Sequence, residues 1–355
     1  MPASLRGPTL TARALNRALL ARQLLLERGT GSIEQAVERI GGLQTQNAPS
    51  GYLGLWSRLA RLTREAYTTA LDERRLVQGW LMRVTIHTVS AADYWPMAVA
   101  VRRARRAWWL RTLRVDEAEV RRAAEAIREE LAGGPVRQRE LHRRMAQRGF
   151  SREVTNGAGL WVDLVRVPPQ GTWERPRADN YGLAVDWLPP RDIAEADARE
   201  WLVRRYLAAH GPAAPADASG WTGLPVAELR PVIERMDLRR FRDEAGRELL
   251  DLPDALLPDP DTPVPVRFIG SFDPVLLVQA RRTQILPEAF RPVIFSTRTP
   301  RSWHTFLVDG QVAGTWSYGA SGVALEPLRK LAADERRSVE EEAHRLEAFI
   351  GVASA

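Results

Sequence analysis

The chain has 355 residues, of which 45% are hydrophobic and 27% charged, and it carries a net charge of +7. This length exceeds that of one typical compact domain, so we expect two or three domains or several small repeated modules. The absence of cysteine excludes disulfides, thiolate metal sites and cysteine nucleophiles. No apolar run approaches about 18 residues and the N-terminal segment lacks a signal-peptide core, so we expect a soluble cytoplasmic protein.

Almost all of the positive charge comes from arginine, because Lys330 is the single lysine. The arginines gather in two stretches, residues 101–114 and 137–149. A basic protein with such clusters suits a polyanion such as DNA, since each phosphate that is neutralised releases counterions. Solvated helix faces would explain the same two stretches equally well.

The first 114 residues read as helices followed by a β-ribbon. Helical spacing of apolar residues predicts helices near 11–29, 32–42, 50–62 and 64–73. Ser32 and Gln35 form a capping-box pattern at the start of the second helix. Residues 76–90 then favour strand, with β-branched side chains around Ile86. This is the element order of a winged helix-turn-helix module.

The same order of elements recurs twice, although the amino-acid sequence of the copies is not visibly repeated. Three helical segments, 116–134, 137–149 and 151–167, precede a ribbon in 168–189. A third copy has helices in 197–211 and 215–236 and a ribbon in 238–253, with the turn at 243–246. We therefore predict module boundaries of 1–114, 115–190 and 191–258.

The remaining chain has a different pattern of residues. Residues 259–325 alternate short β-rich runs with Pro and Gly turns, and Asp309-Gly310 marks a hairpin tip. Residues 326–355 read as an amphipathic helix that packs inside the protein. The predicted fold class is α+β, with three tandem winged helix-turn-helix modules, a small barrel-like β unit and a C-terminal helix.

Five stretches together carry a family resemblance: 42–59, which contains "GLQTQN", 81–94, 171–188, 272–291 and 304–316. In them the chain resembles the AlkZ-like (azinomycin-resistance type) winged-helix DNA glycosylases, over roughly Leu15 to Trp316. The resemblance implies a C-shaped clamp that acts on bulky N7-alkylated purines, including those in interstrand crosslinks. It also implies that Gln44 and Gln46, the QxQ pair, are catalytic and face the central channel.

The chemistry of the lesion gives an independent reason for two amides. A purine alkylated at N7 is cationic and already an activated leaving group, so no general acid has to protonate it. A glutamine oxygen can accept from the attacking water while its NH2 group donates to a phosphate or sugar oxygen. Neutral amides are weak bases, so positioning must supply most of the rate. The alternative is that Gln44 and Gln46 cap helix carbonyls or satisfy a turn.

DNA contact is assigned to a wider set of residues, several of them at positions that match the family. They are Asn47, Ser50, Arg83, His87, Arg102, Arg103, Arg105, Arg106 and Arg282. For His87 a structural role is as well supported, and Trp108 and Trp109 are expected to anchor the arginine helix in the core.

Four positions depart from the family pattern or remain ambiguous. Gln279 and Arg281 stand where the family often has His and Asp, and Thr45 fills the middle of the QxQ motif. Asp273 fits a turn cap better than a brace for the lesion pocket.

Other chemistries have little support. The five histidines are scattered without metal-ligand spacing, so we expect no metal and no cofactor. Lys330, placed on the terminal helix, is a poor amine nucleophile, so we expect a monofunctional enzyme. The expected partner is double-stranded DNA with bulky alkyl lesions, bound by a nucleoid-associated monomer without membrane contact. QxQ favours self-resistance to a genotoxic natural product over general repair. The rival function is a non-catalytic winged-helix regulator.

Overall fold

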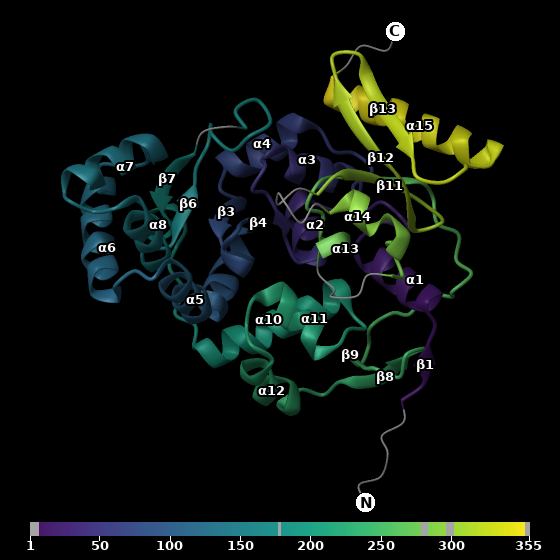
Figure 1. Ribbon diagram of the computed structural model, residues 1–355, viewed down its shortest axis with the longest axis horizontal. Coiled ribbons are helices and arrows are strands. Elements are labelled where there is room, and N and C mark those ends of the chain that lie inside the picture. The colour runs from purple at the N-terminus through teal and green to yellow at the C-terminus, as the bar shows by residue number, and fades with distance from the viewer. Residues whose placement is uncertain (1–6, 177–178, 278–282, 296–301, 352–355) are drawn as a thin grey trace, which may run out of the picture.

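The computed structural model describes residues 7–176, 179–277, 283–295 and 302–351 (Figure 1). Helices and strands are both abundant and mixed along the chain, which confirms the predicted α+β class. Among these described residues, no helix combines the length and the apolar character needed to cross a membrane.

The first group of elements has the predicted order of helices and then a ribbon. Its helices are α1 (Ala12–Arg22), α2 (Ile33–Ile40), α3 (Pro49–Trp56), α4 (Arg64–Asp72) and the long α5 (Ala91–Leu113). The ribbon consists of β3 (Leu76–Trp80) and β4 (Ile86–Ser90), which pair antiparallel. Ser32 and Gln35 form the predicted capping box. Gly41, at φ 78°, ends α2 in the left-handed region, where a glycine carries no Cβ penalty. The chain then enters the short strand β2 (Leu43–Gln44).

The second group differs from the prediction in its last helix and its ribbon. Its elements are α6 (Glu117–Leu131), β5 (Val136–Arg137), α7 (Gln138–Gln147), α8 (Arg152–Trp161), β6 (Leu164–Arg166), β7 (Asn180–Leu183) and α9 (Ala184–Trp187). The helix expected to reach residue 167 ends at Trp161, because Asp163 adopts φ 51° and turns the chain into β6. The first strand of the ribbon therefore lies inside the segment predicted as helix.

The third group follows the predicted order. Its elements are α10 (Glu195–His210), α11 (Pro215–Thr222), α12 (Val226–Arg235), β8 (Arg239–Asp243) and β9 (Glu248–Asp251). Gly223, at φ 77°, separates α11 from α12. The β8–β9 turn lies at the predicted 243–246, and the N-terminal strand β1 (Thr9–Leu10) pairs parallel with β8.

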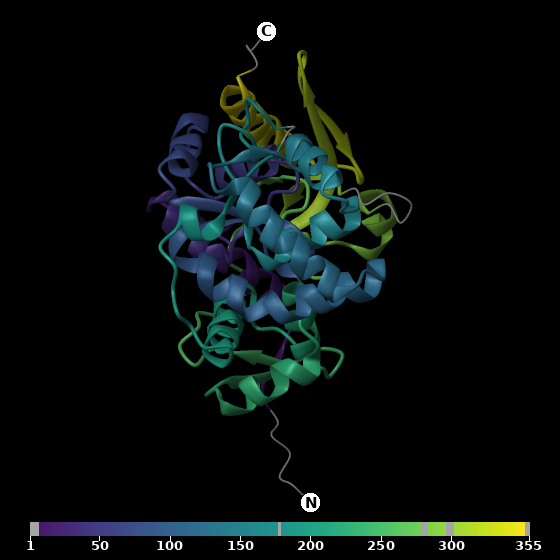
Figure 2. The ribbon, with the colours of Figure 1, turned by 90° about the vertical axis from the view of Figure 1, so that its left-hand side faces the viewer.

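A four-stranded antiparallel sheet forms the C-terminal part, with α15 beside it. The strands are β10 (Arg267–Ile269), β11 (His304–Val308), β12 (Gln311–Gly319) and β13 (Gly322–Pro327), in that order, with α13 (Pro274–Leu277), η2 (Glu288–Phe290) and α14 (Arg291–Ile294) between β10 and β11. Asp309 and Gly310 both have positive φ and form the predicted hairpin tip. Figure 2 shows the C-terminal helix at one end of the molecule and the third group of helices at the other.

The C-terminal helix is shorter than predicted. Residues up to Pro327 belong to β13, and α15 spans Ala333–Ile350. Lys330 therefore lies in the exposed connection before α15 and not on the helix. The apolar side of α15, including Val339 and Leu346, is buried in the same core as α3 and α4, which confirms the prediction of internal packing.

One sheet runs through the first two groups. Its six strands follow the order β2-β4-β3-β6-β7-β5, because β3 pairs with β6 through Gln78 opposite Arg166 and Gly79 opposite Val165. The sequence did not predict this continuity, and the domain boundaries at 114, 190, 258 and 325 stay predictions. The strand that carries Gln44 is one edge of this sheet.

Buried ion pairs fasten the groups to one another. Arg58 on the first group and Asp273 beside the C-terminal sheet form two hydrogen bonds of 2.7 Å each. Arg22 and Asp251 join the first and third groups in the same two-bond geometry, at 2.8 and 2.7 Å. Bidentate arginine–carboxylate pairs are strong and directional, so they define how these groups pack.

Candidate active site

The backbone of β2 places the two glutamines on one side of the chain. Gln44 lies opposite His87 in the antiparallel pairing with β4, and the N–H of Thr45 donates to the Ile86 carbonyl at 2.8 Å. Successive side chains alternate in an extended chain. Thr45 is accordingly fully buried, with its Oγ1 2.9 Å from Thr88 Oγ1. Gln44 and Gln46 share the opposite side.

Both glutamine oxygens are held by the protein. Gln44 Oε1 accepts from Arg83 Nη2 at 3.0 Å, and Gln46 Oε1 accepts from the Ile86 N–H at 3.1 Å. Gln44 is half-buried and Gln46 is exposed, so neither side chain points into a packed core. An amide oxygen has two lone pairs, so each can still accept a hydrogen bond from water. The amide NH2 groups have no hydrogen-bond partner among the described residues and can donate outward.

Arg83 ties the first glutamine to the third group of helices. It lies in the tight turn between β3 and β4, where Arg83 and Val84 both have positive φ, 53° and 56°. Its Nη1 donates to the Trp221 carbonyl at 2.5 Å while Nη2 holds Gln44. Burial lowers the pKa of Arg83 to about 10, so the side chain remains cationic. Arg83 thus holds Gln44, and its expected contact with DNA stays a prediction.

His87 is a neutral, buried neighbour of the glutamines. Its ring is 2% exposed, and Nδ1 lies 3.0 Å from the Thr85 carbonyl, which requires a proton on Nδ1. Burial, together with the charge of Arg83, lowers the pKa of His87 to about 3. The structural role is therefore the one that the geometry supports, and the ring does not reach the surface where DNA would bind.

The other residues expected near the glutamines differ in their exposure to solvent. Ser50 is buried and its Oγ lies 3.0 Å from Ser271 Oγ, so it joins α3 to the C-terminal part and cannot reach DNA. Asn47 is exposed directly after Gln46 and remains a candidate. Arg282, with the departing positions Gln279 and Arg281, lies outside the described residues.

Most arginines of α5 contact protein. Arg105 is buried, pairs with Asp163 and donates to the Trp80 carbonyl, so its DNA-contact assignment is corrected to a structural role. Arg102 contacts the same carboxylate at 3.0 Å. Arg106 donates to the carbonyl of Trp161 at 3.0 Å.

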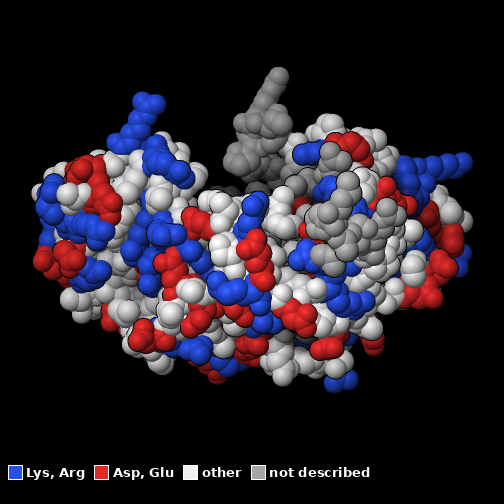
Figure 3. Space-filling view, turned by 90° about the horizontal axis from the view of Figure 1, so that it is seen from below, with Lys and Arg blue, Asp and Glu red and all other residues white. Residues whose placement is uncertain are grey.

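Of Arg102, Arg103, Arg105 and Arg106, Arg103 is the most exposed. Arg103 is 64% exposed and lies 3.0 Å from Glu228. On the face seen in Figure 3, basic side chains are interspersed with acidic ones rather than gathered into one field. Trp109 is buried as expected, but Trp108 is 44% exposed, which corrects the expectation that both tryptophans anchor the helix.

Arg166 is a residue of the site that sequence reasoning missed. It lies in β6, is buried, and donates from Nη1 to the Thr45 carbonyl at 3.0 Å. Asp179 pairs with its Nε at 2.7 Å and so orients the guanidinium. The second group thus holds the peptide between the two glutamines. No local sequence signal marks Arg166, because its partner lies in another module.

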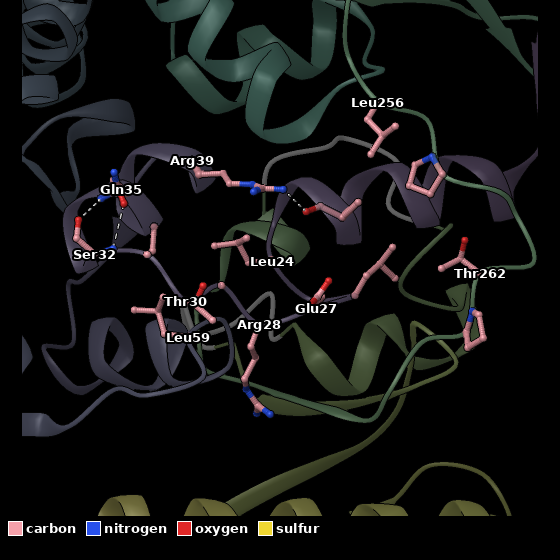
Figure 4. A pocket seen from close by; sticks show the side chains of 17 residues that line it. Leu24, Glu27, Arg28, Thr30, Ser32, Gln35, Arg39, Leu59, Leu256 and Thr262 are labelled. Carbon is pink, nitrogen blue, oxygen red and sulfur yellow. Dashed lines mark hydrogen bonds between the residues drawn. The ribbon is translucent and has the colours of Figure 1, made fainter.

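A large cavity lies elsewhere. It has a volume of about 860 Å³ and lies between the end of α1, the start of α2 and the segment near Leu256 (Figure 4). Two hydrogen bonds join residues of its wall: the Gln35 N–H donates to Ser32 Oγ, and Arg39 Nη2 donates to the Ala21 carbonyl at the end of α1. Neither Gln44 nor Gln46 contributes to its walls. In the described part of the chain, no group of three or more acidic or histidine side chains could hold a metal ion.

Comparisons with known proteins agree with this fold. The model of the family described as DNA glycosylase AlkZ-like matches residues 37–349. A comparison with curated protein sequences finds no match. Among solved structures, the Streptomyces sahachiroi DNA glycosylase AlkZ is similar, with a TM-score of 0.81 and 21% sequence identity over 97% of this chain and 98% of that chain. At that identity the likeness shows a shared fold, whereas the family match spans most of the sequence. The chain belongs to the AlkZ-like DNA glycosylase family and is a DNA glycosylase.

Proposed function

We propose that the protein is a monofunctional DNA glycosylase that hydrolyses the N-glycosidic bond of bulky N7-alkylated purines, including those in interstrand crosslinks, and leaves an abasic site. The observation that carries this proposal is the pair of glutamines in β2 and just after it, with their oxygens anchored and no partner for their NH2 groups among the described residues. We further propose a role in self-resistance to a genotoxic natural product.

The geometry supports catalysis by positioning. The cationic base departs readily, and the water that attacks C1′ has to be held beneath the sugar. The second lone pair of each glutamine oxygen can accept from that water, and the NH2 groups can donate to sugar or phosphate oxygens. Arg83 and the Ile86 N–H fix the two oxygens, so little reorganisation is needed when the lesion binds.

The three groups of helices, each followed by an antiparallel strand pair, act in this proposal as winged-helix modules of a C-shaped clamp around duplex DNA. The element order and the shared fold support this interpretation. A winged helix by itself indicates only DNA binding. Catalysis therefore has to be tested directly.

The test is excision from a duplex that carries one bulky N7-alkylguanine. We expect release of the modified base and a heat-labile abasic site without added metal or cofactor, and no reaction of unmodified guanine. Borohydride should trap no enzyme–DNA adduct, since the mechanism uses no amine. Binding of duplex DNA without release of any of several bulky N7 adducts would favour the non-catalytic regulator instead.

The proposal assigns phosphate contact to Arg102, which is partly exposed, and to Arg103, which is largely exposed. DNA phosphates would replace Asp163 and Glu228 as their partners. We expect the Arg102→Ala/Arg103→Ala double variant to lower the slope of log K against log salt concentration by roughly one unit per lost contact. Gel shifts at several salt concentrations measure this slope, with Arg336→Ala on α15 as the control. An unchanged slope would leave α5 outside the DNA interface.

A further inference from the structure

Next to the glutamine pair lies a second pocket, for which the proposed function names no occupant. Its volume is about 330 Å³, at the lower end of the range of roughly 300–1,000 Å³ for small-molecule pockets. α5 forms one wall, the β3–β4 turn a second and the end of α11 a third. The lining residues are Arg83, Val84, Val101, Ala104, Arg105, Trp108, Thr222 and Gly223.

Trp108 is the unusual side chain of this pocket. It is 44% exposed, whereas the adjacent Trp109 is buried and donates its Nε1–H to the Glu153 carbonyl at 3.1 Å. Trp108 lines the pocket and is accessible to whatever enters it. The face of an indole ring is its stacking surface. Such a face stacks on planar aromatic groups and attracts cationic ones.

Arg83 connects this pocket to the reacting site. The same side chain that lines the pocket donates to Gln44 Oε1 at 3.0 Å. Pocket and catalytic amide are therefore one hydrogen bond apart. Gly223 lies against the other side of Arg83: a Cβ at that position would come within 3.3 Å of the Arg83 nitrogen. The close approach of α11 to the β3–β4 turn thus depends on a residue without a side chain.

The chemistry of the lesion indicates what the pocket could hold. In a purine, a single ring carbon separates N7 from N9, and the bond that breaks joins N9 to C1′. A substituent on N7 therefore lies within a few Å of the reacting bond. When Gln44 faces that bond, the substituent lies within reach of Arg83 and of the pocket that Arg83 lines.

We propose that this pocket, the Trp108 pocket, binds the N7 substituent of the lesion, and that the preferred substituent is a planar fused-ring aromatic group. This inference rests on the proposed function. Val84, Val101 and Ala104 remove the ring system from water, and Trp108 stacks on it. Arg83 uses two of its five N–H groups on partners in the described part of the chain, so it can also donate to a carbonyl or ether oxygen on the substituent.

The test compares two duplexes, one with N7-methylguanine and one with an N7-(naphthylmethyl)guanine. Single-turnover excision is followed over a range of enzyme concentrations for the wild type, Trp108→Ala and Trp108→Phe. The matched control is Trp303→Ala, which removes a tryptophan that is 45% exposed and does not line the pocket. Ala104→Phe fills the pocket from the α5 wall, and thermal melting shows whether each variant folds.

We expect Trp108→Ala to lower the second-order excision rate of the naphthylmethyl lesion on the order of 10- to 100-fold, as for loss of one stacked aromatic ring. The methyl lesion should change less than about 3-fold, Trp108→Phe should restore most of the rate, and a folded Ala104→Phe should show the same selectivity. Equal losses on both lesions, or none on either, would overturn the subsite while the proposed function stands. Release of neither base by the wild type would refute the proposed function itself.

Discussion

Replacing Gln44 or Gln46 by alanine is expected to lower the single-turnover rate of base release on the order of 10²-fold or more, while duplex binding changes little. In the proposed mechanism each side chain positions the reacting water through an oxygen that the protein already holds. Loss of a positioning or proton-handling group typically has an effect of this size. Quenched-flow or manual single-turnover assays on an N7-alkylguanine duplex measure the rate.

Gln147→Ala is the matched control, because Gln147 is an exposed glutamine at the end of α7. It should leave the excision rate unchanged. The double variant Gln44→Ala/Gln46→Ala should lose less than the product of the two single effects if both amides hold one water. Wild-type rates in the double variant would show that the pair is not catalytic.

The second large expected effect concerns stability. Asp273→Asn should lower the free energy of unfolding by about 3–5 kcal/mol, because it leaves the Arg58 charge buried and unpaired. Both side chains of this pair are essentially inaccessible to solvent, and the two bonds between them measure 2.7 Å. Arg58 also donates to the Gly54 carbonyl and to Gln23, but these neutral partners cannot replace the carboxylate charge.

Urea denaturation at neutral pH measures this loss. Glu117→Gln is the control, because Glu117 pairs with Arg121 on the surface of α6, and exposed pairs contribute under about 1 kcal/mol. A loss below about 1 kcal/mol for Asp273→Asn would mean that water enters the site and solvates Arg58.

Local features of the fold could be predicted because their causes lie within a few residues. The capping box at Ser32, the left-handed glycine that ends α2 and the Asp309-Gly310 hairpin each depend on backbone preferences of neighbouring residues. The burial of α15 follows in the same way from the spacing of its apolar residues. Lengths were less well predicted, since the end of α8 depends on the conformation of a single residue, Asp163.

The family resemblance implied Gln44 and Gln46 as the candidate pair, and their catalytic role stays a prediction. The QxQ spacing places two amides on one side of an extended chain, which needs no knowledge of distant residues. Identifying the atoms that hold the two amides does require knowledge of distant residues, because Arg166 contacts Thr45 from 121 residues away. Likewise, the α5 arginines resemble a DNA-binding cluster in the sequence. In the folded protein, Asp163 and backbone carbonyls of the second group pair with several of them. A sequence pattern shows where the charged residues lie, but the packing determines whether their side chains are already paired within the protein.

The sheet shared by the first two groups links the strand of Gln44 to the folding order of the chain. β2 is a two-residue edge strand, and its sheet extends through pairings that close loops of many tens of residues. Such contacts raise the contact order and incur loop-closure entropy before they contribute any stabilisation. The Arg166 contact with the peptide between the glutamines therefore forms only once the first two groups have folded together. A fragment that ends at α5 would retain the QxQ motif but would lack the contact from Arg166 to the peptide backbone of that motif.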